Sequence, residues 1–117
     1  MVVRSNLTDA ALDRIFHALS DRTRRDIVTR LLSGDEASVS TLAARYDMSF
    51  AAVQKHVAVL EGAGLVTKRP RGRERIVRGN PHPLARARQL LQQLELLWAS
   101  RFSQLDAVLA DPRPSKE

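Results

Sequence analysis

Residues 41–66 contain two apolar sets at helical spacing with a turn between them, and this stretch constrains the fold more than any other. The apolar residues before the turn are Leu42, Tyr46 and Met48, and those after it are Val53, Val57 and Leu60. Both sets can be buried together only if the chain bends sharply between two helices. The stretch therefore predicts a helix-turn-helix at about 40–62.

The residues around the predicted turn favour the same interpretation. Asp47 tolerates a left-handed backbone better than most residues, and the Ser49 hydroxyl can cap the amides that open the second helix. Gly62 and Gly64 are expected to close that helix.

The outward residues at the start of the second helix suit contacts with DNA. With Val53 and Val57 inward, the residues facing out are Phe50, Ala51, Gln54 and Lys55. Gln can pair with adenine, Lys can donate to guanine or phosphate, and Ala or Phe can touch a thymine methyl. The alternative is an ordinary polar face of a surface helix, because this pattern alone gives many false positives.

Most of the net charge lies just after this motif. Residues 68–78 hold six basic residues and one acid, a net +5 of the chain's +6. Residues 65–67 and 74–78 contain β-branched residues around a Pro-Arg-Gly-Arg turn signal, which predicts a basic β-wing at about 65–79. Such a wing would follow phosphates or enter a minor groove. A solvated basic loop without a partner is the alternative.

Three further helices are expected before and after these elements. The first should begin near Thr8 after a frayed terminus and end at Leu19, and the second should run from Ser20 or Asp21 to Gly34. Residues 35–37 form a loop in this prediction, and Ser38 or Ser40 caps the third helix. Most of the basic residues of the second helix are expected in intrahelical and core-edge roles, with contacts to phosphate as the alternative: Arg22, Arg24, Arg25 and Arg30.

The last helix, predicted at 84–110, has an apolar stripe too long for one small domain to cover. At 1.5 Å per residue it spans roughly 40 Å, so we expect it to pair with its copy in a two-fold dimer, aided by the helix at 8–19. Packing within one protomer is the alternative. The interface residues expected are Leu12, Ile15, Phe16, Leu91, Leu94, Trp98, Phe102 and Leu105. Residues 111–117 should be a disordered tail.

Composition narrows the functional classes. The chain has 117 residues, which fits a single domain over 1–117, and it has no Cys, which excludes disulfides and thiolate metal sites. No apolar run is long enough for a membrane span and no signal peptide is evident, so a cytoplasmic protein without membrane partners is expected. No nucleophile motif or phosphate loop indicates an enzyme.

Three segments resemble the ArsR/SmtB family of winged helix-turn-helix repressors: FHALSDRTRRDIVTRLLSG at 16–34, STLAARYDMSFAAVQKHVAVLEGAGLV at 40–66, and the wing KRPRGRERIV. The resemblance implies a mainly α fold with one β-hairpin between the fourth and last helices, and a homodimer through the first and last helices. It also implies repression at a pseudo-palindromic promoter site, often the repressor's own, on double-stranded DNA.

The resemblance further implies particular DNA-contacting positions. Those that match are Ser49, Phe50, Ala51, Gln54, Lys55 and His56 on the reading helix, and Arg69, Arg71, Arg73 and Arg75 in the wing. For His56, two roles stay open: a phosphate contact, or a half-buried structural histidine.

The chain departs from metal-sensing members of that family. The third helix reads TLAARYD without a Cys-x-Cys pair, and the last helix has no His after His82. We therefore expect no metal and no cofactor. Two alternatives stay open: a regulator with a small-molecule effector near Trp98 and Phe102, although such aromatics are more often core, and a winged-helix protein-interaction module. The basic wing argues against the module.

Overall fold

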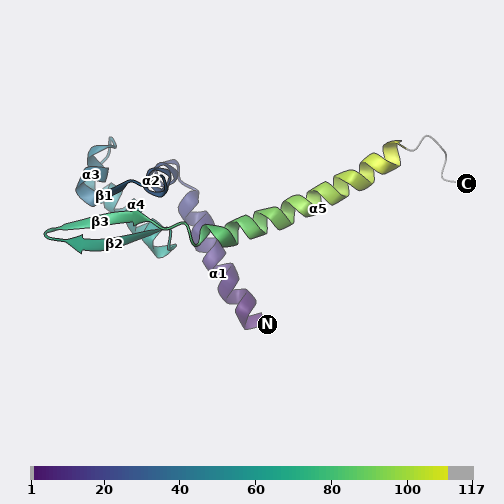
Figure 1. The fold of residues 1–117 in the computed structure, drawn as a ribbon, viewed down its shortest axis with the longest axis horizontal. Coiled ribbons are helices and arrows are strands. Elements are labelled where there is room, and N and C mark those ends of the chain that lie inside the picture. The colour runs from purple at the N-terminus through teal and green to yellow at the C-terminus, as the bar shows by residue number, and fades with distance from the viewer. Residues whose placement is uncertain (1, 111–117) are drawn as a thin grey trace, which may run out of the picture. The chain divides into compact units, whose positions relative to one another are not determined.

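The computed structural model describes the backbone of residues 2–110 and the side chains from Asp9 to Ala110. The elements in chain order (Figure 1) are α1 (Val2–Leu19), α2 (Arg22–Leu32), β1 (Glu36–Ser38), α3 (Val39–Ala44), α4 (Phe50–Gly62), β2 (Val66–Arg71), β3 (Glu74–Gly79) and α5 (Leu84–Ala110). The chain divides into two compact units, Met1–Ala87 and Arg88–Glu117, with the division inside α5. The expected tail at 111–117 lies outside the described residues.

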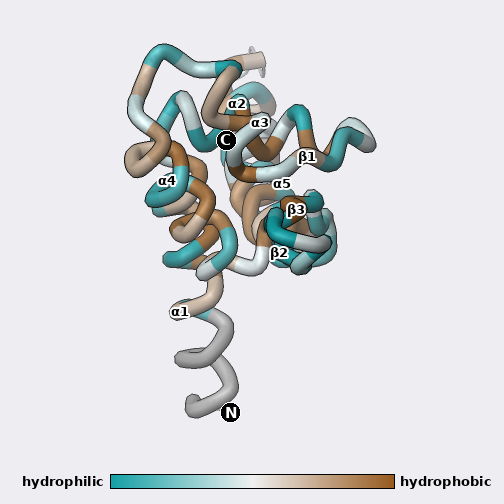
Figure 2. The backbone as a smooth tube through the Cα atoms, turned by 90° about the vertical axis from the view of Figure 1, so that its left-hand side faces the viewer, coloured by the Kyte–Doolittle hydropathy of each residue, from teal (hydrophilic) through white to brown (hydrophobic). Residues whose placement is uncertain are grey.

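The predicted helix-turn-helix consists of α3 and α4. Val53, Val57 and Leu60 on α4 are fully buried, as is Leu42 on α3, and they join one core that includes Ile27 of α2. Tyr46 and Met48 are half-buried against this core. In Figure 2 the β2–β3 hairpin is mostly hydrophilic, whereas α4 alternates between hydrophobic and hydrophilic residues. This alternation is the amphipathic pattern expected of a helix with one buried face.

A three-stranded antiparallel sheet of order β1-β3-β2 replaces the expected two-stranded wing. Residues 35–37 were predicted to be a loop, and this was wrong for Glu36 and Ala37. Glu36 pairs with Arg78, and Ala37 with Val77. The segment becomes a strand because β3 offers it a free edge, which is a non-local cause that three residues of sequence do not reveal.

Side-chain and glycine caps set the ends of the helices. Asp21 caps α2, Ser38 caps α3 and Ser49 caps α4, each accepting from a backbone amide three residues later. After α4, the Leu65 amide donates to the Leu60 carbonyl at 3.0 Å and Gly64 has a φ of +77°. This left-handed closure turns the chain directly from α4 into β2.

Helix α1 begins at Val2, not at Thr8 as predicted. Residues 2–8 contain neither Pro nor Gly, so nothing in them breaks a helix. Along this helix Ile15 is only 1% exposed, which places it in the protomer core and not on the free surface where we expected an interface residue. Leu12 is half-buried, and Phe16 is 37% exposed.

The second unit is the part of α5 beyond Ala87. Every described side chain from Leu91 to Ala110 is exposed, including the large apolar ones. Trp98 is 64% exposed and its ring centroid lies 5.2 Å from that of Phe102. An apolar stripe of this length exposed on one helix is unusual for a protein surface without a partner.

Candidate nucleic-acid interface

The outward side chains of α4 form an exposed surface that is available for contacts with a partner. Phe50, Ala51, Gln54 and Lys55 are all exposed, and Phe50 keeps 47% of its surface accessible. Within the described part of the chain, the Gln54 and Lys55 side chains make no hydrogen bond or ion pair. Ser49 uses its hydroxyl to accept from the Ala52 amide at 3.1 Å, so its side chain serves the helix start.

The pleat of the wing separates its basic residues onto two faces. Cross-strand partners lie on the same face of a sheet, and successive residues lie on opposite faces. Lys68 pairs with Val77, and Pro70 with Arg75; this face also carries the buried Val66. Arg69, Arg71 and Arg78 lie on the other face, around a shallow hollow that also includes Glu36.

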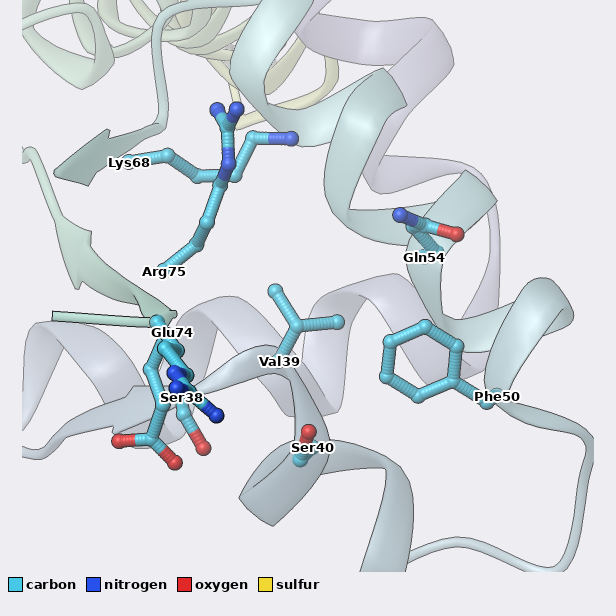
Figure 3. A pocket seen from close by; sticks show the side chains of 9 residues that line it. Ser38, Val39, Ser40, Phe50, Gln54, Lys68, Glu74 and Arg75 are labelled. Atoms are coloured by element: carbon cyan, nitrogen blue, oxygen red, sulfur yellow. The ribbon is translucent and has the colours of Figure 1, made fainter. Parts of the chain in front are cut away.

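The first face and α4 enclose a hollow of about 430 Å³. It is lined by Ser38, Val39, Ser40, Phe50, Gln54, Lys68, Arg73, Glu74 and Arg75. Figure 3 places Phe50 and Gln54 on one side, Lys68 and Arg75 on the other, and Val39 between them. The start of the reading helix and the basic wing therefore share one concave surface.

Half of the wing's basic residues form ion pairs with acidic side chains. Lys68 lies 3.4 Å from Glu61 of α4, while Arg71 and Arg78 lie 3.1 and 2.7 Å from Glu36. Hydrogen bonds and charge attraction from Arg78, then Arg71, lower the pKa of Glu36. Arg69, Arg73 and Arg75 have no ion pair with any residue from 9 to 110. Of these three, Arg73 and Arg75 line the hollow with Gln54.

His56 lies at the junction of α4 with the α1–α2 corner. Its side chain is 21% exposed, with Nδ1 3.9 Å from Asp21 Oδ2 and 3.2 Å from Arg24 Nη1. These contacts are those of the half-buried structural alternative. The other ring nitrogen of His56, Nε2, takes no part in the contacts with Arg24 and Asp21.

Tyr46 anchors the turn of the helix-turn-helix to α2. Its hydroxyl donates to Asp26 Oδ2, which also accepts from Arg30 Nε at 3.0 Å. Burial, followed by the hydrogen bond to Asp26, raises the pKa of Tyr46 to about 12. The Tyr46 and Arg30 hydrogen bonds lower the pKa of Asp26. The Arg30–Asp26 pair confirms one of the intrahelical pairs expected on α2.

Two contributions to this surface were missed from sequence. Ser40 was considered only as a helix cap, yet it lines the hollow. Glu36 was placed in a loop, yet it forms ion pairs with two wing arginines. The sequence around Ser38 gives no local signal that Glu36 forms these ion pairs or that Ser40 lines the hollow.

Neither a metal site nor a membrane span is found in the part of the chain that the structure describes. Over that range, no three His, Asp or Glu side chains gather as a metal site would require. His17, His56 and His82 fall on α1, α4 and the segment before α5. None of the described helices combines the length and apolar character needed to cross a bilayer.

These features define a winged helix-turn-helix domain, with α4 as reading helix and the β2–β3 hairpin as wing. A helix-turn-helix family model matches residues 19–69. A helix-turn-helix-type transcriptional regulator of Bacillus subtilis (strain 168), YuzN, is 42% identical over 78 residues, covering 62% of this chain and 85% of the relative.

Solved structures agree with this class. An ArsR-like transcriptional regulator from Rhodococcus sp. RHA1 has a TM-score of 0.74 and 33% identity, covering 91% of this chain and 98% of the other. A homodimeric winged helix-turn-helix DNA-binding domain from Mycobacterium bovis has a TM-score of 0.62 and 25% identity, covering 79% and 83%. The chain belongs to the ArsR family of DNA-binding transcriptional regulators. The resemblance noted from sequence is thereby confirmed, and this class is not enzymatic.

Proposed function

We propose that the chain is a dimeric repressor that binds a pseudo-palindromic operator on double-stranded DNA, its own promoter included. The observation that carries this proposal is the shared hollow, where Phe50 and Gln54 of α4 face the unpaired Arg73 and Arg75 of the wing. A reading helix uses its N-terminal outward residues on base edges, while basic residues beside it hold phosphates.

In this proposal the reading helix supplies the sequence-specific contacts. Gln54 pairs with a base, Phe50 and Ala51 touch apolar base atoms, and Lys55 donates to guanine or phosphate. Ser49 orients the helix start through its cap. A hydrogen-bonded side chain such as Gln54 on adenine contributes about 1–3 kcal/mol of discrimination.

The wing supplies contacts that do not depend on sequence. Arg73 and Arg75 contact phosphates because they are unpaired and lie on the side of α4. We assign Arg71 a mainly structural role, since Glu36 already accepts from it, and Arg69 a minor one, since it lies on the opposite face. The resemblance alone treated these four arginines alike.

The dimer is supported by the exposed stripe of α5 and by the homodimeric relative from Mycobacterium bovis. Leu91, Leu94, Trp98, Phe102 and Leu105 are each at least half exposed, and pairing two such stripes would remove this apolar surface from water. Leu12 and Phe16 of α1 are further residues that we assign to the dimer interface. Ile15 supports them from the core.

Regulation in this proposal uses neither a metal nor a cofactor, because the metal-ligand motifs of the sensing members are missing from the sequence. A small-molecule effector that releases the repressor is compatible with the fold. A cytoplasmic protein with access to its own promoter fits this role.

The test is a nuclease footprint of the purified protein on DNA upstream of its own gene, repeated over a salt series. A protected, two-fold site that weakens with salt is the expected result, because bound Lys and Arg displace counterions from phosphates. Gln54→Ala should lose about 1–3 kcal/mol on that site and little on unrelated DNA. A single asymmetric half-site, or equal losses on both DNAs, would contradict the proposal.

A further inference from the structure

One guanidinium links the end of α1 to the reading helix. Arg24 Nε donates to the Ala18 carbonyl at 2.8 Å and Nη2 donates to the His17 carbonyl at 3.1 Å. Both carbonyls belong to the last turn of α1, where helix carbonyls lack partners within the helix. The remaining nitrogen, Nη1, lies 3.2 Å from Nδ1 of His56 on α4.

This contact indicates where the imidazole proton resides. A guanidinium carries only N–H donors, so Nδ1 of His56 must be the acceptor. The proton of the neutral ring therefore lies on Nε2. The carboxylate of Asp21 does not reverse this, because its Oδ2 is 3.9 Å from Nδ1 and already accepts from the Arg24 amide at 3.0 Å.

The Nε2–H group has access to solvent. No described residue forms a hydrogen bond with it, and among the described side chains no buried nitrogen or oxygen lacks a partner. Since His56 is not fully exposed and Nε2 is not a buried orphan, Nε2 must be solvent-accessible. A directed N–H donor thus remains free on a residue of α4.

His56 also lies on a different flank of α4 from the wing. It follows Gln54 by two residues, and at 3.6 residues per turn the two side chains leave the helix in roughly opposite directions. Gln54 lines the hollow shared with the wing. A helix in a major groove has phosphates along both flanks, so in a complex with DNA the flank of His56 would face the backbone opposite the one beside the wing.

We propose that Arg24 is a positioning residue for DNA binding: it holds His56 as the Nε2–H tautomer, which donates to a backbone phosphate on the flank of α4 away from the wing. The DNA part rests on the proposed function, while the tautomer part concerns the free protein. Arg24 itself contacts no DNA. Through the same guanidinium, the end of α1 is fastened to the reading helix.

The tautomer is measured first, without DNA, on the full chain. Long-range ¹H–¹⁵N correlation spectra of the neutral imidazoles distinguish Nε2–H from Nδ1–H, and His17→Gln and His82→Gln variants assign the three rings. His56 should be a pure Nε2–H tautomer in the wild type and a mixture in Arg24→Gln. Arg25→Gln is the matched control, because Arg25 donates to the Leu19 carbonyl at 2.8 Å and has no contact with His56. A mixed tautomer in the wild type, or equal effects of both variants, would overturn the link.

DNA affinity is measured next with two isosteric changes. His56→Gln keeps an N–H donor near the Nε2 position, whereas the shorter amide of His56→Asn lies near the Nδ1 position and places no donor at the Nε2 position. Asn should weaken binding to all DNA sequences by about tenfold, the value of one hydrogen bond to a charged group, and Gln should retain most of the affinity. Equal losses for Gln and Asn would overturn the phosphate contact.

A double-mutant cycle separates positioning from folding. Arg24→Gln should weaken DNA binding in the wild type and have little further effect in the His56→Gln background, because no Nδ1 remains to hold. An equal effect in both backgrounds would mean that Arg24 acts through the fold alone. If the wild type binds no DNA while the tautomer result holds, the proposed function fails and the Arg24–His56 link stands.

Discussion

Arg78 donates twice to one carboxylate oxygen of Glu36, from Nη2 at 2.7 Å and from Nε at 2.9 Å. The two residues are also cross-strand partners of β3 and β1. This pair joins the short strand β1 to the wing, and Arg71 donates to the same carboxylate, so both arginines already have a partner within the protein. The basic residues of the wing are therefore unequal.

We predict that the two faces of the wing contribute differently to DNA binding. Arg73→Ala and Arg75→Ala should each weaken binding to all sequences and reduce the slope of log K against log salt by about 1, since each removes one phosphate contact. Binding isotherms over a salt series on operator and unrelated DNA measure this.

Arg69→Ala is the matched control for these two changes. It removes the same charge from an unpaired arginine, but from the opposite face, so its salt slope should stay close to the wild-type value. Equal slopes for Arg69→Ala and Arg75→Ala would show that the pleat does not decide which arginines contact DNA.

Tyr46 gives a direct report on the turn, because it is the only tyrosine of the chain. In the native protein its pKa is about 12, against about 10 in the unfolded chain. A raised folded pKa adds stability below pH 10, and that stability is lost as the pH rises toward 12. Ultraviolet titration of tyrosinate should find the native midpoint above that in denaturant.

Asp26→Asn tests the cause of that shift. The pKa of Tyr46 should fall part of the way toward its ordinary value, because the negative partner is lost while burial remains. Asp35→Asn removes the same charge from a carboxylate paired with Arg45 and should leave the Tyr46 midpoint unchanged. A midpoint unaffected by Asp26→Asn would rule out this hydrogen bond.

Gly79→Ala should destabilise the protein. A Cβ at Gly79 would lie 2.8 Å from the backbone carbonyl carbon of Leu31, and the end of α2 cannot move aside without disturbing the core. The expected loss in free energy of unfolding is about 1–3 kcal/mol. Gly62→Ala meets nothing within 4 Å at the end of α4 and should be neutral or stabilising by up to about 1 kcal/mol. Urea denaturation compares the two, and similar midpoints would contradict the close approach.

The stripe of α5 should mediate dimerisation. Leu94→Glu would place two carboxylates in the interface and weaken the dimer by about 100-fold or more. Gln92→Glu adds the same charge roughly opposite the stripe and should leave the dimer intact. Sedimentation gives the dissociation constants, and the emission of Trp98, the only tryptophan, should shift to the red as the wild-type dimer is diluted. A wild-type protein that stays monomeric would contradict dimerisation through α5.

Local chemistry explains what the sequence could predict. The burial of Val53, Val57 and Leu60 follows from a 3.6-residue period, and the caps at Asp21 and Ser49 follow from hydroxyl and carboxylate chemistry at helix starts. The resemblance proposes DNA-contacting positions only as a group, and these positions stay a prediction. The start of α1 was misjudged because Thr8 has the chemistry of a cap, yet the helix continues through it.

Contacts between distant residues explain what could not be predicted. Glu36 meets Arg78 across 42 residues and Arg24 meets His56 across 32, and no periodicity connects either pair. The burial of Ile15 depends on packing that the apolar stripe of α1 does not specify, since Leu12 and Phe16 share that stripe and stay partly exposed.

The closure at Gly64 leaves only three residues, Ala63 to Leu65, between the reading helix and the first wing strand, and Asn80 returns to fix it by donating to the Gly64 carbonyl at 2.9 Å. We therefore expect the reading helix and the wing to move together, with a constant distance between them. We expect a base substitution in the DNA half-site to weaken binding less than the insertion of one base pair. The insertion would change the spacing between the bases that contact α4 and the phosphates that contact the wing.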